Sequence, residues 1–125
     1  MSTDRELLEL AAKAAGMQLL PKGRWSDDAA GWFYNEHGGA GMFYRGASAP
    51  VTRWNPLTDD GDALRLACKM EFQINIVGEG MCEVKCPERN LAPIWEHIRG
   101  GDSAAATRRA IVRAAADLAD QGTQA

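Results

Sequence analysis

Residues 58–76, with the sequence TDDGDALRLACKMEFQINI, decide the fold because their hydrophobic period changes halfway along. From Ala63 to Met70 the apolar residues recur at the spacings of one helix face. Thr58 is a favourable N-cap, and the aspartates that follow it stand at the positive end of the helix dipole. This stretch therefore predicts a helix over residues 59–70.

Strands are predicted directly after this helix. From residue 72 to residue 76, apolar and polar side chains alternate, which is typical of a half-buried strand. A glycine-containing turn at 78–80 leads to a second alternating run at 82–86, so the two runs predict an antiparallel pair. Residues 94–98 fit either a further strand or one helical turn, and we favour the strand.

Helices are also predicted near both ends of the chain. Thr3 and Glu6 have the spacing of a capping box, and helical periodicity follows them, so a first helix is predicted over residues 4–15. The segment Gly100-Gly101-Asp102-Ser103 suits a helix cap, and the stripe of isoleucine, alanine and leucine that follows it predicts a last helix over residues 103–119. Residues 121–125 are expected to form a frayed tail.

A β-hairpin is predicted in the first half of the chain. Two aromatic runs, 32–34 and 42–44, flank the glycine-rich loop 38–41. The predicted order is α-β-β-α-β-β-(β)-α, in which the bracketed strand is 94–98. We expect one globular α/β domain of the α+β kind over residues 1–120, with three helices packing a mixed or antiparallel sheet of about four to five strands.

Length and charge narrow the classes of function. The chain has 125 residues and a formal net charge of −3, from 14 basic and 17 acidic residues. Proteins that bind duplex nucleic acid usually carry a basic excess, so we do not expect a duplex as the partner. The sequence has no apolar run of membrane-spanning length and no signal peptide, so no membrane partner is expected. Its three cysteines then fit a reducing cytoplasm.

No metal, cofactor or disulfide is expected. Cys82 and Cys86 would lie on one strand face, about 13 Å apart at ~3.3 Å per residue. This distance is too long for ligands of one zinc ion or for a disulfide. We therefore interpret both, together with Cys68, as buried thiols that pack as small apolar side chains.

The remaining candidates for chemistry also have structural explanations. The aspartates at positions 59, 60 and 62 lack the spacing of a calcium loop, and their place at a helix start explains them. His37 and His97 belong to no recognisable catalytic motif, and the loop at 38–41 lacks the lysine of a phosphate-binding loop. We therefore assign no catalytic residue.

Aromatic side chains and arginines gather in the first half of the chain. Rings beside cations suit stacking on a nucleobase whose phosphate is held by guanidinium, or a hot spot for a protein partner. The alternative is a core sheet over which the arginine stems lie. The candidate binding residues, called here the aromatic–arginine cluster, are Arg24, Trp32, Tyr34, Tyr44, Arg45, Arg53 and Trp54.

Three segments carry a resemblance to a known family. They are residues 54–67 (WNPLTDDGDALRLA), 106–115 (ATRRAIVRAA) and 6–16 (ELLELAAKAAG). These segments resemble small phage and prophage proteins of proteobacteria that are similar to the phage ABA-sandwich domain family. The resemblance implies a sheet between helices, a phage origin and therefore the cytoplasm of a bacterial host, and it implies no catalytic residue.

Together these observations predict a non-enzymatic phage or prophage accessory protein that binds and modulates a host protein, as a defence or regulatory protein does. The alternative is a small-molecule binder that sequesters a nucleotide signal through the aromatic–arginine cluster, and a third option is a small enzyme acting on such a nucleotide. The sequence leaves the oligomeric state open, with a homodimer as one option.

Overall fold

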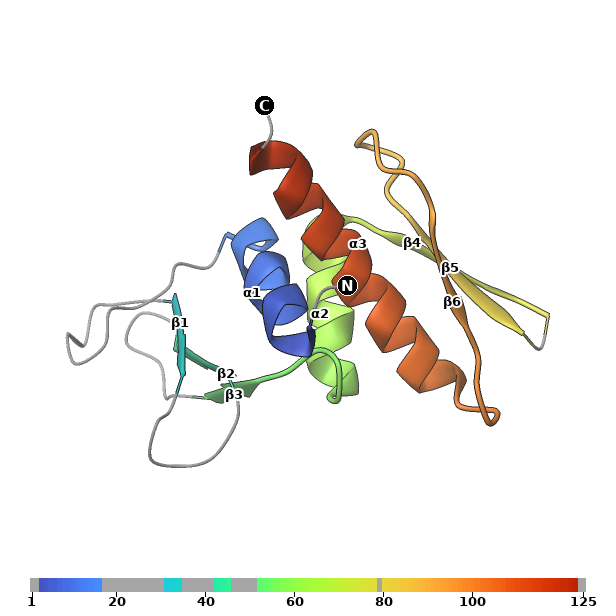
Figure 1. Cartoon of the computed structure of the whole chain (residues 1–125), viewed down its shortest axis with the longest axis horizontal. Helices are drawn as coiled ribbons and strands as arrows, with labels where there is room; N and C mark the ends of the chain where they lie inside the picture. Colours follow the sequence, from blue (N-terminus) through green and yellow to red (C-terminus); the bar gives the residue numbers. More distant parts are fainter. Residues whose placement is uncertain (1–2, 17–30, 35–41, 46–51, 79, 124–125) are drawn as a thin grey trace.

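The three predicted helices and the α+β class are confirmed. A computed structural model describes residues 3–16, 31–34, 42–45, 52–78 and 80–123. Its elements, in chain order, are α1 (Asp4–Ala14), β1 (Gly31–Tyr34), β2 (Met42–Arg45), β3 (Thr52–Trp54), α2 (Asp60–Met70), β4 (Gln73–Val77), β5 (Met81–Lys85), β6 (Ile94–His97) and α3 (Ser103–Thr123) (Figure 1).

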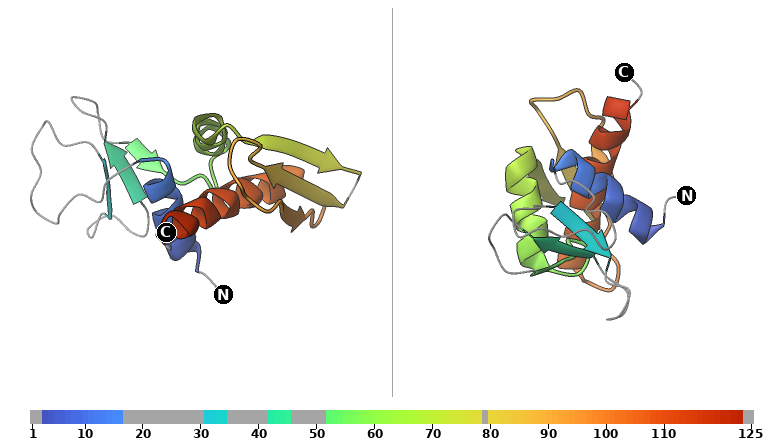
Figure 2. Two further views of the ribbon diagram at one scale, coloured as in Figure 1. Left: turned by 90° about the horizontal axis from the view of Figure 1, so that it is seen from above. Right: turned by 90° about the vertical axis from the view of Figure 1, so that its left-hand side faces the viewer.

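The long helix α3 organises the molecule. Helices α1 and α2 pack on one side of it, and strands β4, β5 and β6 lie on the other (Figure 1). Strands β1, β2 and β3 lie beyond α1, at the opposite end of the molecule from β4, β5 and β6 (Figure 2). Strand β3 leads through a short turn into α2, and Trp54 at its end is buried in the common core.

Small side chains let the helices approach closely. The stripe of α3 that faces the core is made mainly of alanine, and α1 meets it with alanines of its own. Because an alanine adds little bulk beyond the backbone, such a contact brings helix axes near each other and leaves little room for change. The fully buried alanines are Ala11, Ala12, Ala110, Ala114 and Ala115.

The start of α1 follows the prediction. The Thr3 hydroxyl accepts a hydrogen bond from the Glu6 amide at 3.2 Å, and the Thr3 amide donates to the Glu6 carboxylate at 3.3 Å. This is the predicted capping box. At the other end of the chain, α3 continues to Thr123, so the first residues of the tail that was expected to fray are helical.

The cap of α2 corrects the prediction by one residue. Asp59, rather than Thr58, is the N-cap, and its carboxylate accepts from the Asp62 amide at 2.8 Å. The chain makes a turn just before the helix, in which the Thr58 and Asp59 amides both donate to the Asn55 carbonyl. This turn satisfies Thr58 and leaves the carboxylate, a stronger acceptor, for the helix end.

The strands form two sheets rather than one. Among the described residues there are two three-stranded antiparallel sheets, ordered β1-β2-β3 and β4-β5-β6. The number of strands therefore differs from the four or five expected, because residues 52–54 pair with β2 as an additional strand. Helix α2 then carries the chain away to the other side of the molecule, and a separate sheet begins. The hairpin of β1 with β2 and the strand at 94–97 agree with the prediction.

Strand β4 exists as predicted, but it is not half-buried. All five of its residues are exposed, including Ile74, Ile76 and Val77. The alternation correctly indicated a strand. The alternation could not show whether another element packs on this strand. Helix α3 packs on β5 and β6 and does not cover β4, which lies at the edge of the sheet.

Two further observations complete the fold. Cys82 and Cys86 are buried, as interpreted, whereas Cys68 is exposed on α2 and does not pack as a buried thiol. Within the described part of the chain, the helices contain no stretch that is long and apolar enough to cross a membrane.

Candidate functional site: the open side of the sheet β4-β5-β6

The sheet β4-β5-β6 has two sides of different character. Toward α3 it presents Cys82, Val84 and Ile94, which are buried in the core. The register pairs Ile74 with Val84, and Val84 with Ile94. One row across the sheet therefore consists of Ile74, Val84 and Ile94. Because successive side chains on a strand point to opposite sides, the alternate rows point away from α3.

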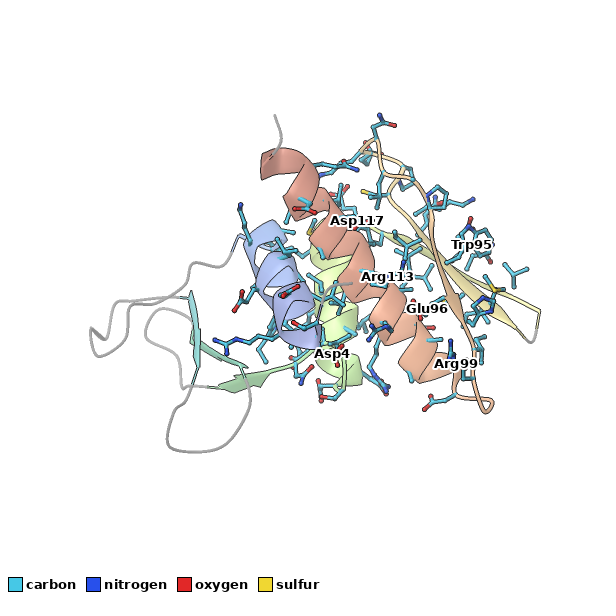
Figure 3. All side chains as sticks on the ribbon, in the orientation of Figure 1. Asp4, Trp95, Glu96, Arg99, Arg113 and Asp117 are labelled. Atoms are coloured by element: carbon cyan, nitrogen blue, oxygen red, sulfur yellow. The ribbon has the colours of Figure 1, made fainter. Side chains whose placement is uncertain are left out.

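The side away from α3, called here the open side, is mostly polar and exposed. Its central row pairs Asn75 with Glu83, and Glu83 with Trp95. Figure 3 shows Trp95 on the outside of the sheet, away from α3. The open side consists of Gln73, Asn75, Val77, Met81, Glu83, Lys85, Trp95 and His97.

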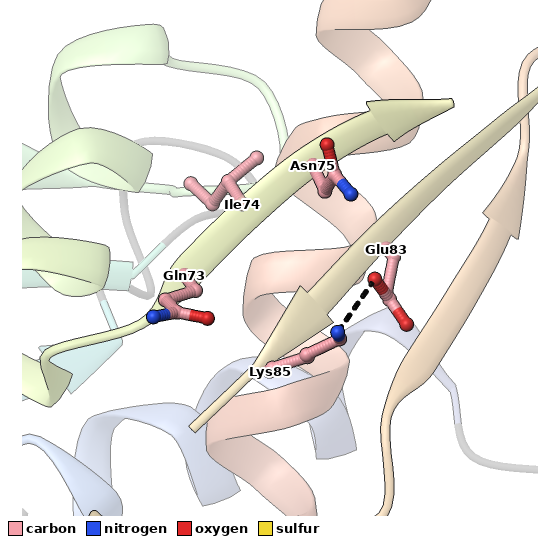
Figure 4. A pocket seen from close by; sticks show the side chains of 5 residues that line it. All are labelled: Gln73, Ile74, Asn75, Glu83 and Lys85. Atoms are coloured by element: carbon pink, nitrogen blue, oxygen red, sulfur yellow. Dashed lines mark ion pairs between the residues drawn. The ribbon is translucent and has the colours of Figure 1, made fainter. Parts of the chain in front are cut away.

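Glu83 is a buried carboxylate at the centre of this otherwise exposed side. Only 7% of its side chain is exposed, and its Oε1 atom lies 3.4 Å from Lys85 Nζ (Figure 4). A buried charge is costly unless it is paired and hydrogen-bonded, and this ion pair involves one of the two carboxylate oxygens. A shallow hollow of about 240 Å³ lies beside the pair, lined by Gln73, Ile74, Asn75, Glu83 and Lys85.

Trp95, on β6, lies opposite Glu83 of β5 and is 43% exposed. Its strand is held from behind by α3: Arg113 donates to the Trp95 carbonyl at 3.1 Å and to the Glu96 carboxylate at 2.5 Å. Arg109 lies 3.8 Å from the same carboxylate. The indole is therefore presented to solvent from a backbone that is anchored to the core helix.

The edge of the sheet at β4 is apolar. Ile74, Ile76 and the nearby Leu64 of α2 are 39%, 53% and 62% exposed. A groove of about 330 Å³ runs beneath them between β4, α2 and α3. At one end of this groove Arg108 pairs with Asp60 at 2.6 Å, so this charged pair is already satisfied.

Only part of the aromatic–arginine cluster can be located. Trp54 is buried in the core, which fits the packing alternative for that residue. Trp32 lies opposite Tyr44 in the β1–β2 register, and Arg53 lies opposite Phe43 in the β2–β3 register. Tyr34 and Arg45 are in β1 and β2, while Arg24 lies outside the described residues, as does His37. As a binding surface the cluster stays a prediction.

The acidic residues at the start of α2 have structural roles, although the capping role of Asp59 was predicted for Thr58. Asp62 is buried and accepts from the Asn55 amide at 2.9 Å and from Arg65 at 2.7 Å. Asp60 pairs with Arg108, and Asp59 caps the helix. In the ranges that the structure describes, no three His, Cys, Asp or Glu side chains are grouped closely enough to hold a metal ion.

The open side was not singled out from the sequence. Glu83 and Lys85 were interpreted as the polar positions of a half-buried strand, and Trp95 as part of a strand that a helical turn could replace. The available signal was the alternation itself, which places Glu83 opposite to Cys82 and Val84. That the same side would remain free of a covering helix depends on where α3 lies.

Comparisons with known proteins give no relative for this chain. Protein-family models, curated proteins and solved structures were compared, and none of them gave a match.

Proposed function

We propose that the protein is a non-enzymatic binding protein that takes a protein partner on the open side of the sheet β4-β5-β6. The observation that carries this proposal is the exposed indole of Trp95 beside the buried carboxylate of Glu83. Tryptophan is among the residues most enriched in protein-binding hot spots, which lie where a large ring is surrounded by groups that exclude water.

The polar side chains around Glu83 support recognition. A carboxylate, an ammonium and two amides surround the hollow, and these groups give direction and charge to a contact. Burial of Glu83 means that its charge is already largely desolvated before any partner arrives. When a donor from a partner reaches this carboxylate, the desolvation cost of the carboxylate is therefore smaller than that of an exposed acid.

The setting of this function is also part of the proposal. The resemblance of residues 54–67 and 106–115 to phage proteins supports an accessory protein that modulates a host factor in the bacterial cytoplasm. The net charge of −3 fits a protein partner better than a nucleic-acid duplex. Nucleotide sequestration by the aromatic–arginine cluster is retained as the alternative.

The test is partner capture by tagged protein in host lysate, followed by affinity measurement with the purified captured protein. Trp95→Ala should weaken the affinity about thirtyfold or more, which corresponds to the roughly 2 kcal/mol of a hot-spot residue. Glu88→Ala, at an exposed site in the loop between β5 and β6, is the control and should bind like the unmodified chain.

Two results would contradict the proposal. One is equal affinity of the Trp95→Ala and Glu88→Ala variants when both melt at the same temperature as the unmodified chain. The other is a melting temperature that rises with an added nucleotide and does so equally in Trp95→Ala, since stabilisation by mass action would then favour the nucleotide alternative.

A further inference from the structure

We propose that a second copy of this chain pairs with strand β4, edge to edge and antiparallel, about a two-fold axis at Asn75. The two sheets β4-β5-β6 would then form one six-stranded sheet. This inference goes beyond the proposed function and concerns the apolar edge of the sheet, whereas the protein partner was assigned to its open side.

The β4 edge lacks the usual protection against pairing. In natural proteins, charged side chains, proline or bulges commonly prevent an edge strand from pairing with another chain. Residues 73–77 have the sequence QINIV, which contains no charge and no proline, and all five pair with β5 in an unbroken register. The opposite edge, β6, follows Pro93 and carries Glu96 and His97. A partner strand is therefore accommodated far better at β4.

The sequence of β4 is complementary to itself. A two-fold axis at Asn75 places Ile74 of each copy opposite Ile76 of the other, and Gln73 opposite Val77. The two isoleucine pairs lie on the side of the sheet that carries the groove, because Ile74 and Ile76 line it. Aliphatic pairs directly across an antiparallel ladder are stabilising, and the same arrangement brings the two Asn75 amides together on the open side.

The charges around the groove also favour a second copy. Its apolar walls include Ala63, Leu64 and Ile111, and its charged pair, Asp60 with Arg108, is already satisfied at 2.6 Å. Strand β4 has no charged side chain, and the charges of Asp60 and Arg108 neutralise each other. A molecule that binds here therefore needs no charge of its own. A second β4 brings two exposed isoleucines and no charge, which is the complement that this edge requires.

The consequence is a continuous surface for the partner. Pairing at β4 would join the open sides of two copies, with one Trp95 on each half. The pairing itself covers Ile74 and Ile76 and leaves Trp95, two strands away on β6, uncovered.

A cysteine placed at the axis provides the most direct test. Residues directly opposite in an antiparallel ladder have Cα atoms about 4.5–5.5 Å apart, within disulfide range. In a Cys68→Ser background, which removes the exposed native thiol, Asn75→Cys should form a covalent dimer under mild oxidation. Glu88→Cys in the same background is the matched exposed control and should remain monomeric. Equal cross-linking of the two variants would overturn the proposal.

Light scattering supplies the second measurement. The unmodified chain should have twice the mass of one chain at about 100 µM, and Ile76→Lys, which puts a charge on the edge, should have the mass of one. Ile76 is exposed, so the lysine should not prevent folding, and a thermal melt checks this. If the unmodified protein has the mass of one chain, the proposed dimer is wrong. If Ile76→Lys is still a dimer, the proposed pairing through β4 is wrong.

The two proposals fail in different ways. Trp95→Ala should weaken the affinity for the partner and keep the dimer mass. Ile76→Lys should lose the dimer mass while Trp95 stays exposed. A monomer that still captures its partner through Trp95 rejects only the dimer. A dimer whose partner capture is unchanged by Trp95→Ala rejects only the proposed binding surface.

Discussion

The two sides of the sheet β4-β5-β6 are built from the same strands, but one side is buried and apolar and the other is mostly exposed and polar. On the side of α3, Val84 and Cys82 are fully buried. On the open side, one residue away along the same strand, Glu83 holds a charge beside an exposed tryptophan. The composition of the strands does not by itself separate these two roles. The side that α3 covers stabilises the protein, and the side that α3 leaves uncovered is available to a partner.

The largest effect should come from placing a charge on the covered side. Val84→Asp puts a carboxylate where no solvent reaches, and an unpaired buried charge costs more than a domain of this size can tolerate. We expect the variant to lack the native circular dichroism spectrum. Gln73→Asp makes the same charge on the open side and should melt cooperatively near the unmodified chain. A folded Val84→Asp variant would break the comparison.

A smaller effect should distinguish the two faces of α2, which extend the same contrast. Leu66 is buried and Leu64 is exposed, two residues apart on one helix. Leu66→Ala should cost about 2–5 kcal/mol of unfolding free energy because it leaves a cavity. Leu64→Ala should cost about 0.5 kcal/mol or less, as surface substitutions do. Urea denaturation measures both, and equal losses would mean that the inner face of α2 is not core.

The smallest expected effect concerns the outer face of α3. Asp117 is exposed, and partial desolvation raises the pKa of its carboxyl; Arg113 lowers this pKa and Asp120 raises it further. The folded state therefore holds this proton more tightly than the unfolded state, and the contribution to stability falls as the pH rises from about 3.8 through the folded pKa. Asp117→Asn should melt slightly higher than the unmodified chain at pH 7.

The pH dependence supplies the control for Asp117. Near pH 3 the carboxyl is protonated in both states, so the two proteins should melt at the same temperature. Melting curves between pH 3 and pH 7 measure the difference. A difference that is constant over this range would show that the carboxylate charge is not its cause.

Local signals predicted most of the elements. The Thr3 and Glu6 spacing marked the start of α1, and the change of period after Met70 marked the passage from α2 to β4. These predictions succeeded because capping and periodicity depend on residues within one or two turns of each other. Thr58 was chosen as the cap of α2 instead of Asp59, because the turn at Asn55 that satisfies Thr58 is invisible in a residue pattern.

Burial was predicted less well than element type. Ile74 and Ile76 were expected on a covered strand face, and Cys68 was expected to be buried, yet all three are exposed. Each error concerns what lies opposite a side chain, and that depends on residues distant in sequence. The open-side site was missed for the same reason, since Glu83 and Trp95 are brought together by the pairing of β5 with β6.

The sequence by itself determined the three helices, the alternation along β4 and β5 and the N-terminal cap of α1, because these follow from backbone geometry and short-range hydrogen bonds. Only the tertiary structure decided that the strands divide into two sheets, that α3 covers β5 and β6 but not β4, and that Trp95 is presented beside Glu83. The physical reason is that a strand has two equivalent sides until another element packs on one of them. That choice depends on how the alanine face of α3 fits the rest of the core.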